Sequence, residues 1–155
     1  MIRHRAAAII LREDNLLVMK RDKHGEKYYS FPGGGIERGE TPIQTVSREI
    51  KEETCLEVEV GPEIYRHTYE NGEKQYYFLC KYISGTPKFT PGINELVSNK
   101  TGDLHELVWL PMQKLPETLL YPLEIRDWLI EDIKHGFPKK PRIAKLTISK
   151  LRQTL

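Results

Sequence analysis

The sequence is poor in cysteine and has no long apolar run. It holds only two cysteines, Cys55 and Cys80, which cannot form a disulfide framework and do not have the spacing of a metal site. We interpret both as small buried hydrophobic side chains in a protein of the reducing cytoplasm. The longest apolar run near the start, residues 6–11, is too short to cross a bilayer and carries no signal-peptide cleavage pattern or lipidation signal. We therefore expect a soluble, cytoplasmic protein with no membrane partner.

Acidic residues are missing from the end of the chain, where none follows Asp132. Residues 1–133 carry 17 basic and 22 acidic side chains, a net charge of −5, whereas residues 134–155 carry 7 basic side chains, a net charge of +7. A basic tail can bind nucleic acid, phosphates or an acidic partner surface. More often it is a solvated end, or a strand with lysines on its exposed face, and this is the interpretation that we prefer.

The chain also lacks internal repeats and low-complexity tracts. Its 155 residues, 39% hydrophobic and 30% charged, are typical of a globular domain with a hydrophobic core. We expect one domain over residues 1–138, with a basic tail over residues 139–155 that packs on this domain or extends from it. A homodimer is left open.

Hydrophobic alternation predicts several strands and two helices. Strands are predicted at residues 3–11, 16–20, 56–60, 63–70, 74–83 and 104–110, with a tight hairpin turn at residues 71–72. The strand at 74–83 is apolar on both faces and should be covered on both sides. Residues 21–27 and 84–103 are predicted as loops, the second unusually long. The pattern as a whole predicts a mixed sheet packed between helices.

The helix predicted over residues 42–54 has a well-marked start. Thr41 can cap it, Pro42 suits its first position, and Gln44 completes a capping box. The apolar positions at helical spacing, which should face the core, are Ile43, Val46 and Ile50. The second helix is predicted over residues 122–135 and ends at a glycine.

Three glutamates on the first helix suggest a metal site. Glu49, Glu52 and Glu53 are surface neighbours, because residues three and four apart lie on one face. Their carboxylates repel, and a divalent cation such as Mg²⁺ or Mn²⁺ would remove that repulsion. Arg48 can pair with Glu52 and orient it. The competing interpretation is a solvated, charged helix face.

Glycines just before this helix strengthen the first interpretation. Gly33, Gly34 and Gly35 let the backbone come close to a phosphate, or ligate a metal through a carbonyl oxygen.

These residues resemble the Nudix hydrolase family. The box of that family is written G-x5-E-x7-R-E-U-x-E-E-x-G-U, where U is aliphatic, and eight of its nine fixed positions match here. The matching residues are Gly34, Glu40, Arg48, Glu49, Ile50, Glu52, Glu53 and Leu56. The departure is Cys55, where the family has glycine just past the helix and a positive φ is often needed. More loosely, the resemblance extends over residues 3–135.

The resemblance implies an α/β/α sandwich with a mixed sheet. It also implies Mg²⁺- or Mn²⁺-dependent hydrolysis of a pyrophosphate bond in a nucleoside di- or triphosphate derivative, with a small-molecule nucleotide as the partner. Glu49, Glu52, Glu53 and the Gly33 carbonyl are then the expected metal ligands, Glu40 is an accessory acid, and Arg48 orients the glutamates. The candidate substrate-binding residues are Arg5, Arg21, Gly34, Gly35, Asp103 and Glu106.

The sequence leaves the general base and the substrate open. Glu49 and Glu52 are candidates for the base, and so are three acids of the later loop, Glu95, Asp103 and Glu106. Several tyrosines could stack on a base, although strand tyrosines are usually part of the core. Two alternatives to the enzyme are kept: a non-catalytic nucleotide sensor, and, ranked lower, a pyrophosphohydrolase of RNA 5′ ends that docks through residues 139–152.

Overall fold

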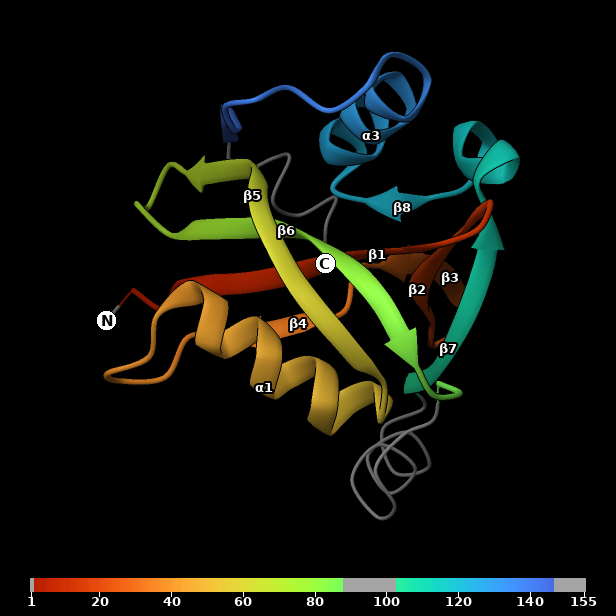
Figure 1. The fold of residues 1–155 in the computed structure, drawn as a ribbon, viewed down its shortest axis with the longest axis horizontal. Helices are drawn as coiled ribbons and strands as arrows, with labels where there is room; N and C mark the ends of the chain where they lie inside the picture. Colours follow the sequence, from red (N-terminus) through yellow and green to blue (C-terminus); the bar gives the residue numbers. More distant parts are fainter. Residues whose placement is uncertain (1, 88–102, 147–155) are drawn as a thin grey trace.

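A computed structural model of the chain describes residues 2–87 and 103–146 (Figure 1). The strands are β1 (Arg5–Arg12), β2 (Asn15–Lys23), β3 (Glu26–Ser30), β4 (Gly33–Gly35), β5 (Glu57–Tyr69), β6 (Lys74–Ser84), β7 (Asp103–Pro111), β8 (Leu120–Tyr121) and β9 (Arg142–Leu146). The helices are α1 (Pro42–Thr54), the 3-10 helix η1 (Met112–Glu117) and α3 (Leu123–His135). In this described part of the chain, no helix is long and apolar enough to span a bilayer.

The strands form one mixed sheet in the order β8-β3-β2-β1-β6-β5-β9, with β4 added to β1 and β7 added to β2. β1 and β2 pair only beside their turn, at Leu11 with Leu16 and at Arg12 with Asn15. Beyond these pairs they separate like the arms of a fork. β4 then pairs with the free edge of β1, and β3 pairs with β2. The link from β3 to β4 therefore crosses the fork.

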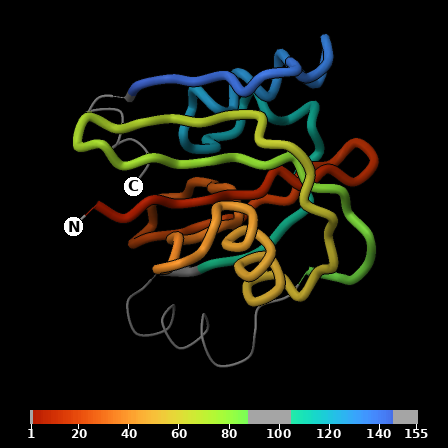
Figure 2. The backbone as a smooth tube through the Cα atoms, turned by 60° about the vertical axis from the view of Figure 1, so that its left-hand side comes forward, coloured from red at the N-terminus to blue at the C-terminus, as the bar shows by residue number. Residues whose placement is uncertain are grey.

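Two hydrophobic cores cover the two faces of the sheet. Side chains of β1 alternate between them: Ala7 and Ile9 belong to the core under α3, whereas Ala6, Ala8 and Ile10 belong to the core under α1. This alternation follows from the two-residue period of a strand. Figure 2 shows α1 and α3 on opposite sides of the strands. The predicted α/β/α sandwich is confirmed, and so is the prediction that the β6 strand is covered on both sides.

Helix α1 has the predicted bounds and the predicted cap. The backbone N–H of Thr41 donates to Gln44 Oε1 (2.9 Å), and the backbone N–H of Gln44 donates to Thr41 Oγ1 (3.2 Å). Val46 and Ile50 are fully buried, but Ile43 is 52% exposed, so its predicted place in the core was wrong. Thr45 and Thr54 are buried instead.

Several other elements differ from the prediction. The glycines at residues 33–35 form a short strand, β4, against β1. The two strands predicted at residues 56–60 and 63–70 are one strand, β5, interrupted by shifts in register. The loop predicted at residues 21–27 is mostly strand, because β2 and β3 form a hairpin there. Within the basic tail, β9 pairs in parallel with β5.

Candidate active site

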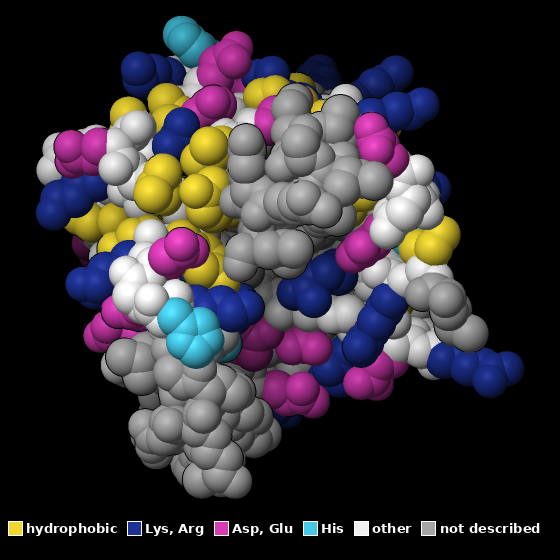
Figure 3. All heavy atoms as spheres, turned by 180° about the vertical axis from the view of Figure 1, so that it is seen from behind, with side chains coloured by type: hydrophobic (Ala, Val, Ile, Leu, Met, Phe, Trp, Pro, Cys, Tyr) yellow, Lys and Arg dark blue, Asp and Glu magenta, His cyan; other side chains and the backbone are white. Residues whose placement is uncertain are grey.

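A cavity of about 330 Å³ lies where β1 and β2 separate, with α1 on one side. It is lined by Arg5, Met19, Arg21, Ser30, Phe31, Gly33, Glu49, Glu52, Glu53 and His105. The three glutamates come from α1, and each of the two arginines comes from one arm of the fork. Figure 3 shows acidic side chains beside lysine and arginine side chains near the middle of the face seen from behind. The cavity thus combines carboxylates with cationic groups.

Glu53 is the least solvated of the three glutamates. Burial raises the pKa of its carboxyl to about 9, and Glu49 adds to the rise through a hydrogen bond and through its charge. The charge of Arg5 and a backbone hydrogen bond from Gly33 act in the opposite direction. One turn of α1 therefore holds two carboxyl groups together in a poorly solvated corner, where a negative charge is costly without a cation.

The glycines of β4 make this close packing feasible. A Cβ atom at Gly34 would overlap the carboxylate of Glu49. A Cβ atom at Gly33 would overlap the backbone of Ala6 and Ala7 on β1, with which β4 pairs. Only glycine lets the backbone come this close to both neighbours.

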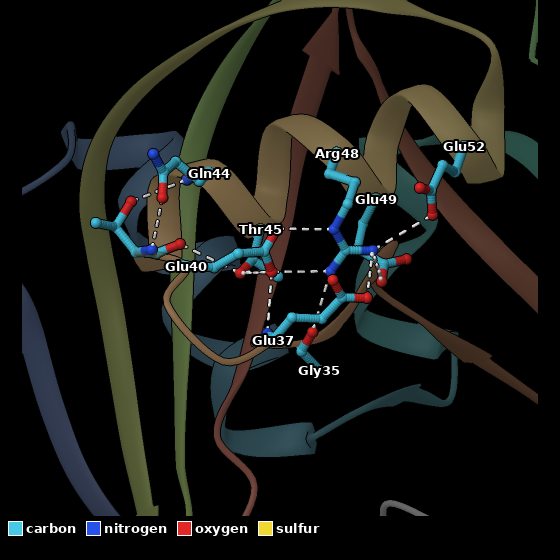
Figure 4. Close-up of polar contacts among 9 residues, drawn as sticks. Gly35, Glu37, Glu40, Gln44, Thr45, Arg48, Glu49 and Glu52 are labelled. Atoms are coloured by element: carbon cyan, nitrogen blue, oxygen red, sulfur yellow. Dashed lines mark hydrogen bonds and ion pairs between the residues drawn. The ribbon is translucent and has the colours of Figure 1, made fainter.

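Arg48 connects the acidic groups on the outer side of α1 (Figure 4). Its Nε donates to Glu40 Oε2 (2.8 Å), and its Nη2 donates to Glu40 Oε1 (3.0 Å) and to the carbonyl oxygen of Gly35 (3.3 Å). Its Nη1 donates to Glu49 Oε1 (3.0 Å) and to Glu52 Oε2 (3.3 Å). One guanidinium thereby ties β4, the start of α1 and two pocket glutamates together.

Glu40 lies outside the cavity and supports Arg48. The hydrogen bond from Arg48 is the largest cause that lowers the pKa of Glu40 to about 2, and the backbone N–H of Glu37 and the hydroxyl of Thr45 add to the effect. Glu40 in turn raises the pKa of Arg48. The pair stays ionised over the physiological range and keeps the guanidinium in place.

The carboxylates fit a divalent cation by their chemistry. Glu49, Glu52 and Glu53 line one cavity, and carboxylate oxygens are the ligands that Mg²⁺ and Mn²⁺ prefer. Among the residues that the structure describes, no three aspartate, glutamate, histidine or cysteine side chains already surround one point. Glu52 Oε2 accepts a hydrogen bond from Nη1 of Arg48, the same atom that donates to Glu49.

The cavity includes part of the predicted substrate-binding set. Arg5 and Arg21 line it. Gly34 and Gly35 do not line it, although Gly33 does. A Cβ atom at Gly35 would overlap the guanidinium of Arg3. Glu106 is exposed on β7 and does not line the cavity, whereas the next residue, His105, does. Asp103 is the first residue of β7, and Glu95 lies outside the described residues.

Sequence reasoning did not single out Met19, Ser30 and Phe31, which also line the cavity. Nothing in the local sequence indicates that these residues are part of the site. They come together only because β3 pairs with β2 in the gap between β1 and β2. His105 of β7 also lines the cavity.

A second cavity, of about 390 Å³, continues from the first. Both cavities are lined by Arg5, Arg21, Ser30 and Phe31, and the second is further lined by Tyr28, Tyr69, Glu73, Gln75, Tyr121 and Pro122. The two cavities thus meet at the pair of arginines.

The sequence was compared with protein families and with curated proteins. The sequence model of the NUDIX domain matches residues 2–130. The 8-oxo-dGTP diphosphatase of Escherichia coli is 47% identical over 54 residues, which cover 33% of this chain and 42% of that protein. The RNA pyrophosphohydrolase of Pelagibacter ubique is 22% identical over 153 residues, which cover 86% of this chain and 92% of that protein.

Solved structures resemble this fold over most of its length. The crystal structure of a NUDIX hydrolase from Nitrosomonas europaea superimposes with a TM-score of 0.66 at 21% identity, and the match covers 94% of this chain and 79% of that chain. By contrast, the chain spans only 50%, 27% and 53% of the length of the first three curated relatives that it matches.

Proposed function

Because this chain belongs to the Nudix family, we propose that it is a hydrolase that cleaves a phosphoanhydride bond in a nucleoside di- or triphosphate derivative with the help of a divalent metal ion. The observation that carries the proposal is the placement of Glu49, Glu52 and Glu53 opposite Arg5 and Arg21 around one cavity. The carboxylates suit a cation, and the arginines suit the phosphate oxygens of a substrate.

We propose that Glu49, Glu52 and Glu53 hold the metal, Mg²⁺ or Mn²⁺, and that the carbonyl oxygen of Gly33 is a further ligand. Such an ion, when bound, polarises the phosphate, activates water and stabilises the leaving oxygen. Arg48 orients Glu49 and Glu52 through its Nη1 atom, which contacts both.

The other residues of the cavity act on the substrate directly. Arg5 and Arg21 bind the phosphate chain from the two arms of the fork. A carboxylate takes a proton from the attacking water, and we assign this role to Glu52, the most exposed of the three glutamates. Glu49, Glu95, Asp103 and Glu106 are the alternatives for this role.

Product release from a panel of substrates tests the proposal. The panel contains the nucleoside triphosphates, 8-oxo-dGTP, dinucleoside polyphosphates, nucleotide sugars, ADP-ribose and an RNA with a 5′-triphosphate, each with Mg²⁺, with Mn²⁺ and with chelator. We expect metal-dependent turnover that falls by at least about 100-fold in Glu53→Gln. The matched control is Glu59→Gln, an exposed glutamate on β5, which should keep full turnover.

Two results would redirect the proposal. Nucleotide binding without turnover of any substrate would support a non-catalytic sensor. Turnover of the triphosphorylated RNA alone would support the RNA 5′-end enzyme, an alternative that the match to an RNA pyrophosphohydrolase over 86% of this chain keeps in view.

A further inference from the structure

The strand β9 lies beyond the residues that match the NUDIX domain, which end at residue 130. It pairs in parallel with β5, from Arg142 beside Tyr65 to Leu146 beside Tyr69. Tyr69 is the last residue of β5 and lines the second cavity. A strand that follows the matched domain therefore supports the part of β5 that ends at a cavity wall.

Buried rings connect this part of β5 to the cavity. The ring centroids of Tyr65 and Tyr77 are 6.5 Å apart, and the ring of Tyr77 meets that of Phe31 edge-on at 5.5 Å. Phe31 lines both cavities. The ring of His67 lies 5.4 Å from that of Tyr77 and 4.6 Å from that of Tyr69. We call these five residues the aromatic row, and none of them is more than 8% exposed.

One buried carboxylate holds the end of the aromatic row that is farthest from the cavity. Asp132 of α3 accepts from the hydroxyl of Tyr65 and from Nη2 of Arg142, both at 2.6 Å. Asp132 is 2% exposed, so the loss of Arg142 would leave its charge poorly paired and would draw it towards water. Tyr65 would shift with it. Because protein interiors are close-packed, such a shift is passed to the neighbouring rings.

We infer that the contact between Arg142 and Asp132 is a positioning contact for the substrate, because it fixes Tyr65 and, through the aromatic row, Phe31 and Tyr69 at the cavity. The inference rests on the proposed function, and it adds β9 to the parts of the chain that shape the site. With β9 docked, the cavity walls are ordered before the substrate binds. With the contact broken, binding must order them, and affinity falls.

The glutamates of α1 and Arg48 are not members of the aromatic row, so the chemical step should change little when the contact is lost. This gives the inference a kinetic signature. Arg142→Ala and Tyr65→Phe each remove one contact of Asp132, and neither residue lines a cavity. We expect KM to rise about three- to tenfold in each variant, with kcat within about twofold of the wild type.

Two further variants examine the route. In Arg142→Ala combined with Tyr65→Phe, the two effects on KM should not add, because both act on the same carboxylate. Arg142→Lys keeps a cation near Asp132 and should recover part of the affinity. Steady-state kinetics with Mg²⁺ on the best substrate of the panel measures all of these variants.

The matched control is Arg66→Ala. Arg66 pairs with Glu63 at 2.7 Å and lies 4.8 Å from the centre of the Tyr76 ring, and its side chain is 32% exposed, against 31% for Arg142. Arg66 comes directly after Tyr65 in β5 and therefore points to the opposite face of the sheet. Its replacement should lower stability to a similar extent and leave KM unchanged.

Binding of ATP, GTP, CTP and UTP, measured by calorimetry in chelator, repeats the comparison without turnover. A KM within about twofold of the wild type in Arg142→Ala or in Tyr65→Phe would overturn the inference, and so would an equal rise in Arg66→Ala. If no substrate is hydrolysed but both variants bind nucleotide more weakly, the inference stands and the proposed function fails. If turnover is metal-dependent and KM is unchanged in the variants, the proposed function stands and the inference fails.

Discussion

The guanidinium of Arg48 shows how much of the site depends on one side chain. It contacts both oxygens of Glu40 and one oxygen each of Glu49 and Glu52. Its planar fork of donors allows this set of contacts, which the single ammonium group of a lysine cannot reproduce. We therefore expect Arg48→Lys to lower kcat by about 10- to 100-fold with a smaller change in KM, because Glu49 and Glu52 lose their orientation.

Steady-state kinetics on the best substrate of the panel, with Mg²⁺, measures this effect. The matched control is Arg66→Lys, since Arg66 makes a comparable pair with Glu63 on β5 (2.7 Å) and does not line the cavity. Full activity of Arg48→Lys would contradict an orienting role.

His67 makes the stability of the fold sensitive to acid. It is fully buried against Tyr69 and Tyr77, and burial lowers its pKa to about 4. Between pH 6.5 and about pH 4, His67 binds a proton in the unfolded chain but not in the folded protein. The free energy of unfolding therefore decreases as the pH is lowered through this range. The loss amounts to about 3 kcal/mol at its lower end. Replacing His67 should make the free energy of unfolding depend less on pH in this range.

Urea unfolding of the wild type and of His67→Gln between pH 4 and pH 7 measures the slope. The free energy of unfolding of the variant should be lower at pH 7, through the loss of packing, but should depend less on pH. His135→Gln, at an exposed position of α3, should keep the wild-type slope. Parallel curves for the wild type and His67→Gln would exclude His67 as the cause.

Among the elements, helix α1 was predicted almost completely because its determinants are local. Its cap, its first proline and its three pocket glutamates lie within one continuous segment, and their spacing fixes which of them are neighbours. The exception is Ile43, which is 52% exposed, whereas Val46 and Ile50 of the same predicted stripe are fully buried. The spacing of apolar residues predicts which face of a helix packs on the sheet, but not which residues of that face are buried.

The end of α1 carries the one departure from the family box. Cys55 has φ 60° and ψ 17°, a left-handed conformation that glycine adopts without penalty. Its side chain is exposed, so the prediction that both cysteines are buried was wrong for Cys55, whereas Cys80 is buried. We expect Cys55→Gly to raise the free energy of unfolding by about 1 kcal/mol and to leave turnover unchanged, since Cys55 contributes nothing to the cavity.

Chemical denaturation and kinetics of Cys55→Gly test both parts of this prediction. Cys55→Ala is the matched control: it removes the thiol and keeps the Cβ atom, so it should show no gain in stability. A large increase in turnover for Cys55→Gly would mean that the native helix end distorts the site.

At the scale of the whole molecule, the cavity depends on pairings that no local pattern contains. Arg5, Arg21 and the tyrosines were recognised as candidates, but each has an ordinary strand context. They meet because β1 and β2 separate after two pairs, β4 and β3 occupy the gap, and β6 lies in parallel beside β1. Parallel pairing of this kind joins segments far apart in the chain, and the sequence does not encode its register in short motifs.

The attachment of the basic tail also depends on contacts between segments that are far apart in the sequence. Asp132 of α3 is 2% exposed and accepts from the hydroxyl of Tyr65 on β5 and from Nη2 of Arg142 on β9, both at 2.6 Å. One buried carboxylate thus joins a helix, an inner strand and the last strand of the sheet. Arg142 also lies 5.8 Å from the centre of the Trp128 ring. Elsewhere β9 is held by backbone pairing with β5, and its Ile143 side chain is 64% exposed.

We therefore expect Arg142→Ala to release β9 from the sheet. The loss in the free energy of unfolding should be about 1–3 kcal/mol, below the cost of breaking a fully buried pair, because the Arg142 side chain is 31% exposed and water can replace part of the contact. Hydrogen exchange should show loss of protection at the β9 amides while β1 and β6 stay protected. Lys145→Ala, which removes an exposed cation from the same strand, should change neither quantity. Unchanged protection of β9 in Arg142→Ala would mean that backbone pairing with β5 alone holds the tail.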